Sequence, residues 1–347
     1  ADYERARVLW KVADLIEENA SLLAELECLN TGIPKFQAET ITKVGAEWFR
    51  YYAGWCTKVS GIARDVNTGG LTGIESHMHA YTMKEPYGVV GLIFPWNGPV
   101  FNYCAKLAPA LAAGCSTVVK PAEETPLSAI VFDRILREAG VPDGVVNMVN
   151  GYGHTVGAQI TAHPDVDKVA FTGSTAVGKS ILRQSADSIR RVTLELGGKG
   201  ANIILDDADI DMAVDGALFA CMANNGEACE AGTRLLIPAS RRDEIVEKLI
   251  ERAGTLSLGD PLQPTTHVGP IISAEQRDRI LAYFQITFDL TVLAAVLAII
   301  GYSLNDTIVV FDRVRENFRV LRKATLIENI NISTTQTLLR TMRSEEH

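Results

Sequence analysis

Apolar residues along the first 60 positions recur with the period of amphipathic helices, over residues 4–31 and about 37–60. From Glu85 onward the pattern changes to short apolar runs, each followed by a longer segment with helical spacing. Apolar strands that alternate with helices are typical of a parallel sheet with helices on both faces. The pattern therefore predicts an α/β fold with a Rossmann-like, doubly wound parallel sheet.

The expected strands are short and rich in branched apolar residues. They lie at residues 89–94, 116–120, 145–149, 168–171, 192–196, 201–205 and 233–237. The expected helices among them lie at residues 101–113, 126–139, 155–162, 175–185, 209–225 and 241–252. Near the end of the chain, residues 286–304 contain one charged residue, Asp289, and are long enough to span a bilayer as a helix.

The composition argues against several classes of function. The 347 residues carry a net charge of −9, which disfavours nucleic-acid binding because that needs clustered cations. None of the six cysteines forms a CxxC pair, the six histidines form no HExxH motif, and no GxSxG turn is present. We therefore expect reduced thiols in the cytoplasm, no metal site and no serine-hydrolase chemistry.

Cys229 follows Asn225-Gly226, at a turn where an expected helix has just ended. A thiol on such a loop is accessible and can be partly ionised, whereas a thiol on a helix face usually cannot. Taken alone, the simpler interpretation is a small apolar residue, which is also what we expect of the other five cysteines. Cys229 is therefore a candidate nucleophile that needs support from other residues.

Two polar side chains stand at the ends of expected strands. Glu195 ends an otherwise apolar strand, where burial would raise its pKa toward the range of a general base. Asn97 follows another strand, and its amide is a neutral donor suited to a developing oxyanion. Taken alone, each residue has an ordinary alternative, a surface carboxylate for Glu195 and a turn residue for Asn97.

Glycines recur where expected strands lead into helices. Gly173 would let the backbone approach a phosphate closely, and Ser174 could donate to that phosphate at a helix N-terminus. The segment 151–157 has glycines in a similar position, although their spacing is not GxGxxG. Each loop by itself is weak evidence for a nucleotide.

Lys120 and Glu123 lie just past another expected strand end. Glu123 could bind a pair of ribose hydroxyls, and a 2′-phosphate would meet a like charge there. This favours NAD over NADP as the cofactor. A solvated loop carboxylate is the alternative for Glu123.

Five motifs in this order resemble the NAD(P)-dependent aldehyde dehydrogenase superfamily, over about residues 3–283. They are Phe94-Pro95-Trp96-Asn97, Lys120-Pro121-Ala122-Glu123, Phe171-Thr172-Gly173-Ser174, Glu195-Leu196-Gly197-Gly198-Lys199 and Gly226-Glu227-Ala228-Cys229. The resemblance implies an NAD-binding domain over residues 85–195, with helices of residues 1–84 packed on it. Residues 196–283 would be a partial second α/β domain that carries the nucleophilic cysteine.

The resemblance implies NAD-dependent oxidation of a small aldehyde to a carboxylic acid. Cys229 would attack the aldehyde carbon and the Asn97 amide would hold the oxyanion. A hydride would pass to the nicotinamide, and Glu195 would activate water to hydrolyse the thioester on Cys229. The cofactor would be held by Phe94, Pro95, Trp96, Lys120, Glu123, Gly153, Gly157, Phe171, Gly173, Ser174, Gly178 and Leu196.

Two departures from the family pattern bear on these expectations. Glu227 stands where many relatives carry glutamine, and a carboxylate that faced the thiol would raise the pKa of Cys229. The family's later Glu-x-Phe-Gly-Pro segment is missing, as are the terminal strands through which relatives pair into homo-oligomers. We therefore expect the activity of this chain to be impaired.

Residues 284–347 differ in character, and over 284–343 they resemble a transmembrane part of SecF, a subunit of the bacterial protein-export machinery. The motifs are Phe288–Val292, Gly301–Thr307, Val310–Asn317 and Thr335–Leu338. We expect membrane contact through residues 286–304, and a chain that is a chimera of two incomplete genes. The alternative to aldehyde oxidation is an inactive fragment whose tail associates with a membrane.

Overall fold

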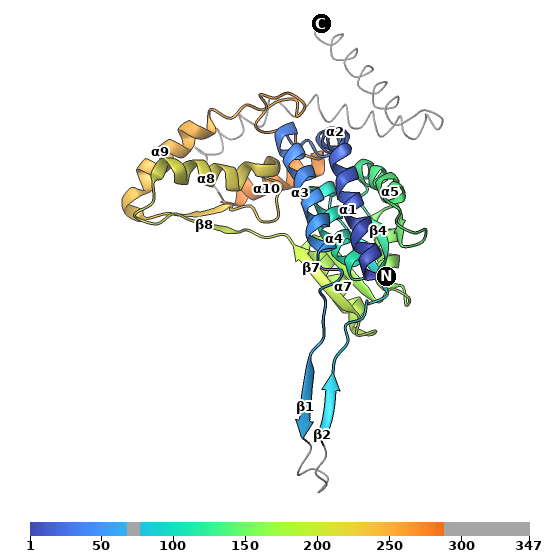
Figure 1. Ribbon diagram of the computed structural model, residues 1–347. Coiled ribbons are helices and arrows are strands. Elements are labelled where there is room, and N and C mark those ends of the chain that lie inside the picture. Colours follow the sequence, from blue (N-terminus) through green and yellow to red (C-terminus); the bar gives the residue numbers. More distant parts are fainter. Residues whose placement is uncertain (68–76, 288–347) are drawn as a thin grey trace, which may run out of the picture. The chain divides into compact units, whose positions relative to one another are not determined.

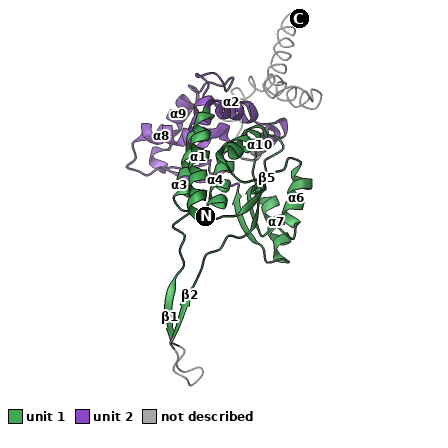
Figure 2. Ribbon diagram, turned by 45° about the vertical axis from the view of Figure 1, so that its right-hand side comes forward, with its two compact units in different colours: residues 1–20, 41–196 green, residues 21–40, 197–347 purple. Residues whose placement is uncertain are grey.

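The computed structural model describes residues 1–67 and 77–287 (Figure 1). The chain divides into two compact units, which Figure 2 shows in different colours. Unit 1 consists of Ala1–Ala20 and Ile41–Leu196, and unit 2 consists of Ser21–Thr40 and Gly197–His347. Each unit has a sheet and an apolar core of its own.

Unit 1 is built on a five-stranded sheet in which all neighbouring strands run parallel. The strand order is β5-β4-β3-β6-β7. The strands are β3 (Val89–Ile93), β4 (Ser116–Lys120), β5 (Val146–Met148), β6 (Lys168–Gly173) and β7 (Arg191–Leu196). This architecture confirms the predicted parallel α/β sheet.

Four helices connect these strands. They are α4 (Pro99–Ala112), α5 (Leu127–Ala139), α6 (Ala158–Ala162), which follows the π-helical turn η1 (Gly153–Gly157), and α7 (Thr175–Ala186). The chain runs outward from β3 to β5, crosses back to β6 and continues outward to β7. Because such crossovers are right-handed, α4 and α5 cover one face of the sheet while α6 and α7 cover the other. The sheet is therefore doubly wound.

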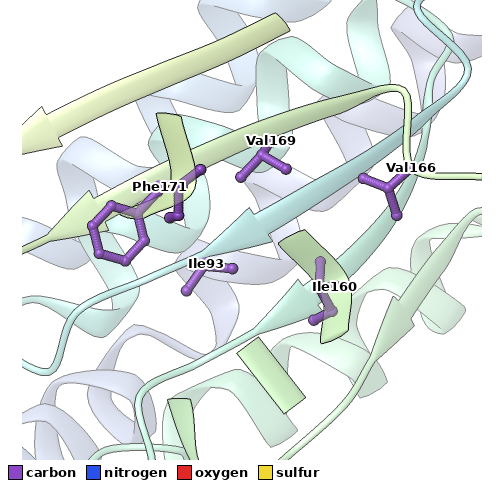
Figure 3. Packing of buried hydrophobic residues seen from close by; sticks show 6 residues of the cluster. Ile93, Ile160, Val166, Val169 and Phe171 are labelled. Atoms are coloured by element: carbon purple, nitrogen blue, oxygen red, sulfur yellow. The ribbon is translucent and has the colours of Figure 1, made fainter. Parts of the chain in front are cut away.

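The core on the α6–α7 face of the sheet is a cluster of branched and aromatic side chains (Figure 3). Ile93 of β3 and Val169 and Phe171 of β6 pack with Ile160 of α6 and Val166. β-Branched residues suit this position, because their side chains fill the space above a pleated surface with little loss of rotamer freedom.

The expected helix over residues 4–31 is two helices. They are α1 (Asp2–Glu18) and α2 (Ala20–Thr31), and α3 (Lys35–Ala53) follows. Asn19 separates the first two, with its amide donating to the Leu15 carbonyl (2.8 Å) and accepting from Arg134 (2.7 Å). Asparagine favours such local bonds over helix continuation, which explains the break inside a continuous apolar pattern.

An antiparallel hairpin of β1 (Ala63–Asn67) and β2 (His77–Tyr81) was not predicted from the sequence. In both ribbon views it extends away from the sheet of unit 1 (Figures 1 and 2). All of its described residues are exposed. They therefore lack the alternation of buried and exposed positions on which strand prediction depends.

Unit 2 has a smaller sheet of two parallel strands, β8 (Ala201–Ile203) and β9 (Arg234–Leu236). Besides most of α2 and the first residues of α3, unit 2 contains α8 (Ile210–Met222), the 3-10 turns η2 (Ala223–Gly226) and η3 (Ala239–Arg241), α9 (Arg242–Ala253) and α10 (Ala274–Thr287). Helices α8 and α9 pack against each other, with Ile210, Val214 and Ile245 buried between them and the strands. The thiol loop, which we define as residues 223–231, follows α8.

The predicted tail lies almost wholly outside the described residues, which end at 287. Within residues 1–67 and 77–287, no helix has the length and apolar character needed to cross a bilayer.

Candidate functional site

The carboxyl ends of four strands in unit 1 meet at one edge of the sheet. Ile93 at the end of β3 pairs with Lys120 of β4 on one side and with Phe171 of β6 on the other. Along the next ladder, Gly173 of β6 pairs with Leu196 of β7. The strand order reverses between β3 and β6, which is where ligands bind in open α/β sheets.

The segment that follows β3 continues the sheet for one residue. The Phe94 N–H donates to the Lys120 carbonyl (3.1 Å), and the buried Phe94 ring lies 5.4 Å from the Tyr103 ring of α4. Pro95, Trp96 and Asn97 are half-buried, and α4 begins two residues after Asn97 at Pro99. The predicted oxyanion donor therefore lies at the carboxyl edge, directly before a helix.

The buried Lys120 and the exposed Glu123 form a hydrogen-bonded network past the end of β4. The Lys120 ammonium, 2% exposed, donates to a Glu123 carboxylate oxygen (3.0 Å) and to the Pro121 carbonyl (2.9 Å). The other Glu123 oxygen accepts from the Gly153 N–H (3.0 Å). Burial alone would raise the pKa of Glu123, but the hydrogen bonds from Gly153 and Lys120 outweigh it and the pKa lies below its usual value.

The turn η1 is thereby held against β4. A Cβ added to Gly157 would lie 3.6 Å from the Lys120 side chain, so the turn and the lysine stem are in van der Waals proximity. Gly153 and Gly157, predicted from a weak glycine pattern, therefore adjoin the Lys120–Glu123 pair.

At the end of β6, Gly173 leaves room for the Phe171 ring. A Cβ on Gly173 would lie 2.5 Å from the ring, which a real side chain cannot do. Ser174 caps α7, and its hydroxyl oxygen accepts from the Val177 N–H (3.3 Å). The neighbouring Thr172 hydroxyl is buried without a hydrogen-bond partner among the described residues.

Gly178 brings α7 close to β7. A Cβ at this position would come 2.7 Å from a Leu196 methyl carbon, so a larger residue would require the Leu196 side chain to move. Gly178 and Leu196, both of which the family resemblance places in the cofactor site, are in contact with each other.

Glu195, at the end of β7, is exposed, so the expected burial of this carboxyl group is not found in the described structure. Lys106, a half-buried residue of α4 that was not among the predicted site residues, interacts electrostatically with Glu195. Burial lowers the pKa of Lys106 to about 8, while the negative charge of Glu195 works in the opposite direction. A cation on the polar side of α4 carries no distinguishing sequence signal.

In unit 2, the thiol loop has an unusual backbone. Asn224 and Asn225 adopt the left-handed conformation with φ of 54° and 58°, and Gly226 follows at 74°. Asparagine and glycine tolerate this region, which explains their concentration here. The chain reverses sharply after α8 and brings Cys229 onto an exposed loop.

The buried Asn225 side chain attaches the loop to two other segments of unit 2. Its amide nitrogen donates to the Gly32 carbonyl (2.9 Å) and the Pro270 carbonyl (3.2 Å), and its oxygen accepts from the Gly269 N–H (2.8 Å). The Asn225 amide thus uses both of its N–H groups and its oxygen. From the sequence, this asparagine is predicted only as a turn residue, because its partners are distant in sequence.

Glu227 is also buried, and its carboxyl group accepts from the Ile272 N–H (3.3 Å). Burial raises the pKa of Glu227 to about 8, and the hydrogen bond opposes this rise. The carboxylate that acts on the thiol is a different one, that of Glu230.

The Cys229 sulfur lies 3.0 Å from a carboxylate oxygen of Glu230. Burial of the sulfur, the hydrogen bond to Glu230 and the negative charge of Glu230 together raise the pKa of Cys229 to about 11. The expectation of a partly ionised thiol is therefore wrong for this structure, although the residue is exposed as predicted.

The residues of the carboxyl edge fit a dinucleotide. Glu123 remains ionised and can accept from hydroxyl groups, and the N-terminus of α7 offers N–H groups to an anion. The Ser174 hydroxyl retains its proton for donation, and the buried Thr172 hydroxyl next to it has no partner among the described residues. The described residues contain no group of three His, Cys, Asp or Glu side chains that could hold a metal ion.

Two family models match the chain. The one described as "Aldehyde dehydrogenase family" covers residues 2–295, and the one described as "Protein export membrane protein SecD/SecF, C-terminal" covers residues 279–345. The second match confirms the resemblance of the tail.

Similar proteins include the "Putative aldehyde dehydrogenase DhaS" of Bacillus subtilis, 44% identical over 282 residues, and human "Retinal dehydrogenase 2", 45% identical over 284 residues. Each alignment covers 81% of this chain and 55% or 53% of the relative.

Similar solved structures include PnpE in complex with nicotinamide adenine dinucleotide, with 45% identity and a TM-score of 0.78. An NAD⁺ complex of aldehyde dehydrogenase from Bacillus cereus has 44% identity and a TM-score of 0.76. Both alignments cover 82% of this chain and 57% of the other, so the chain spans little more than half the length of its relatives. From this identity and the family match over residues 2–295, the chain belongs to the aldehyde dehydrogenase family.

Proposed function

We propose that this chain oxidises an aldehyde to a carboxylic acid with NAD as the electron acceptor and Cys229 as the nucleophile. The observation that carries the proposal is the carboxyl edge of unit 1, where Asn97, the Lys120–Glu123 pair and Ser174 gather at the topological switch point. The NAD complexes among the similar structures support the choice of cofactor.

The cofactor would be held by the carboxyl edge. Glu123 would accept from the ribose hydroxyls and Lys120 would fix its orientation, while Ser174 and the N-terminus of α7 would hold a phosphate. The cofactor site would be lined by Phe94, Pro95, Trp96, Phe171 and Leu196. Room for the cofactor would be left by the glycines Gly153, Gly157, Gly173 and Gly178. The ionised Glu123 would repel a 2′-phosphate, which favours NAD over NADP. When bound, the nicotinamide supplies a hydride acceptor.

The protein residues would carry the covalent and proton-transfer steps. Once its proton has passed to solvent, Cys229 attacks the carbonyl carbon and forms a carbon–sulfur bond, and the carbonyl π electrons move to the oxygen. The Asn97 amide and the Cys229 N–H donate to the oxygen on which negative charge develops. This donor pair stabilises the oxyanion without placing a positive charge beside the thiolate. Loss of a hydride from that carbon to the bound nicotinamide would then leave a thioester on Cys229.

Glu195 would take a proton from the water that hydrolyses the thioester on Cys229. Its exposure leaves it accessible to water, and the lowered pKa of Lys106 provides a second group that can exchange protons near neutral pH. We propose residues 85–195 as the cofactor domain, with residues 1–84 packed on it, and residues 196–283 as the partial catalytic domain. The dehydrogenase part would act in the cytoplasm.

The alternative is an inactive chimera. It is favoured by the family match of residues 279–345 to SecD/SecF and by the coverage of only 53–57% of the relatives' length. Under this alternative, residues 286–304 would contact a membrane. Sequencing the parent DNA across the codons for residues 278–290 tests it, because an unbroken, independently recovered reading frame would contradict an accidental fusion.

Glu195→Gln tests the proposed chemistry directly. Without the base, the thioester forms but is not hydrolysed, so we expect a burst of about one NADH per active chain followed by arrest. Glu138→Gln, which changes an exposed carboxylate of α5, serves as the matched control and should turn over steadily. Steady turnover by Glu195→Gln at the control rate would remove Glu195 from the mechanism.

A further inference from the structure

Cys229 and Glu230 form a thiol–carboxylate pair inside a tight turn. The sulfur lies 3.0 Å from a Glu230 carboxylate oxygen, at hydrogen-bonding distance for a sulfur donor. The Ala231 N–H donates to the Ala228 carbonyl (3.3 Å) and closes the turn around the two residues. The Gly232 N–H then donates to the Ala220 carbonyl of α8 (3.0 Å), which fixes the exit of the loop.

The rest of the loop is held as firmly. Asn225 makes three hydrogen bonds to other segments of unit 2, and Glu227 accepts from the Ile272 N–H. The backbone on both sides of Cys229 is therefore anchored. The contact between the Cys229 sulfur and Glu230 is therefore held by a turn whose backbone is fixed on both sides.

The chemistry of this pair favours the neutral thiol. The S–H group donates to the carboxylate, and loss of its proton would leave two negative charges in contact. The charged side chain that acts on the Cys229 sulfur within the described residues is Glu230. Glu227, the other carboxyl group of the loop, is bonded to the Ile272 N–H, and the Arg234 guanidinium donates to the Lys199 carbonyl.

We propose that Glu230 is a positioning residue that holds Cys229 as a neutral, unreactive thiol until its carboxylate moves off the sulfur. This inference deepens the proposed function and rests on it for the role of Cys229 as nucleophile. An exposed, ionised cysteine would react with oxidants and electrophiles in solution. The contact with Glu230 suppresses that reactivity. As a consequence, the Glu230 carboxylate must move away from the sulfur before Cys229 can attack an aldehyde.

The pKa of Cys229 supports this inference, because it is raised from the usual 9.0 to about 11 and two of its three main causes belong to Glu230. Removing the carboxylate leaves the burial of the sulfur, so the thiol pKa should fall part of the way toward 9.0. The thiolate fraction at a fixed pH rises about tenfold per unit, while the lower basicity of the thiolate takes back about a factor of three.

Alkylation of Cys229 by iodoacetamide tests the inference on the intact chain, with the modified peptide quantified by mass spectrometry. At pH 8 we expect Glu230→Gln to react about three- to tenfold faster than wild type, with its pH profile shifted toward lower pH. Glu247→Gln, which removes an exposed carboxylate from α9, is the matched control and should react at the wild-type rate. Cys229→Ser gives the background from the other thiols.

Equal alkylation rates and coincident pH profiles for wild type and Glu230→Gln would overturn the inference. A second measurement needs no variant of Glu230. The ultraviolet thiolate absorbance of wild type, corrected with Cys229→Ser, should rise only near pH 11, and a rise near pH 9 would also overturn the inference. Neither readout requires turnover, so an inactive chain with a suppressed thiol would refute the proposed function and leave the role of Glu230 intact.

Discussion

Two carboxyl groups, Glu123 in unit 1 and Glu227 in unit 2, are shifted in opposite directions. Burial works to raise the pKa of both. Glu123 accepts from the Gly153 N–H and from the Lys120 ammonium, and its pKa falls below the usual value. Glu227 is more deeply buried, and the hydrogen bond from the Ile272 N–H does not outweigh the burial, so its pKa rises to about 8.

The comparison extends to the chemistry of the two regions. At the carboxyl edge of unit 1, the buried Lys120 ammonium and the Glu123 carboxylate form an ion pair, and each stabilises the charge of the other. In the thiol loop of unit 2, Glu227 gains a proton below about pH 8 and Cys229 keeps its proton beside Glu230. The charge of each carboxyl group follows from the depth of its burial together with the number and sign of its partners.

Replacing Glu227 should give the largest effect on stability. Its folded-state pKa of about 8 lies above the ordinary 4.5, so the folded state binds the extra proton between these values and loses stability as pH rises through them. At about 1.4 kcal/mol per unit, the loss by pH 8 is on the order of 3–5 kcal/mol. Glu227→Gln should abolish this loss of stability with rising pH. Urea unfolding followed by circular dichroism at pH values from 5 to 8 measures it.

The control for this experiment is Glu247→Gln, which should retain the decline of stability with pH. If Glu227→Gln and wild type show parallel stability profiles over this range, Glu227 is not a buried carboxyl group with a raised pKa.

Asn225→Ala should destabilise the chain by about 2–4 kcal/mol. It leaves the Gly269 N–H and the carbonyls of Gly32 and Pro270 without their partner, and at φ of 58° it replaces asparagine, which tolerates the left-handed region, with alanine, which does so less well. Asn225→Gly removes the same hydrogen bonds without the backbone strain, so it should be about 1 kcal/mol less damaging in urea unfolding. Equal stability of Asn225→Ala and wild type would show that these hydrogen bonds do not hold the thiol loop.

Gly178→Ala should destabilise unit 1 by about 0–2 kcal/mol, because the new Cβ would come 2.7 Å from a Leu196 methyl carbon and force that side chain to move at about 1–3 kcal/mol, while alanine recovers about 1 kcal/mol of helix propensity. Leu196→Ala removes the obstructing methyl groups, so the double variant should lose less than the sum of the two single variants. A double-mutant cycle in urea measures this coupling. Additive losses would mean that α7 and β7 do not approach as closely as the structure has them.

Lys120→Met tests the comparison most finely. In wild type, the stability that Glu123 contributes is lost as pH falls through its lowered pKa. Without the ammonium, the Gly153 N–H still opposes the burial but the Lys120 contribution is gone, so the pKa of Glu123 should rise and the loss of stability at low pH should become smaller. Unfolding between pH 3 and pH 6 measures the slope, and an unchanged slope would deny Lys120 its role.

The sequence predicted the sheet of unit 1 well because its strands are continuous apolar runs that alternate with helices. The chemistry-bearing residues at its carboxyl edge followed from strand ends and glycines, which are local signals. The break at Asn19 was missed because a local side-chain bond overrides the apolar period there. The hairpin of β1 and β2 was missed because its residues are exposed and carry no alternation.

The charge states of the site could not be predicted from the sequence. Glu195 was expected to be buried and is exposed, while Lys106 takes its low pKa from tertiary burial. The sequence indicated Glu227 as the carboxylate that could raise the pKa of the thiol, but the carboxylate in contact with the Cys229 sulfur is that of Glu230. Which way a side chain turns from a loop depends on contacts such as those of Asn225, whose partners lie up to 193 positions away.

The formation of NADH from NAD and a simple aldehyde, compared between wild type, Cys229→Ser and Cys221→Ser, tests the central claim most directly. The account predicts NADH formation by wild type and by Cys221→Ser, whose thiol is half-buried on α8, and a loss of at least about a thousandfold in Cys229→Ser. Equal rates in Cys229→Ser and wild type, or no NADH above background from either, would contradict it.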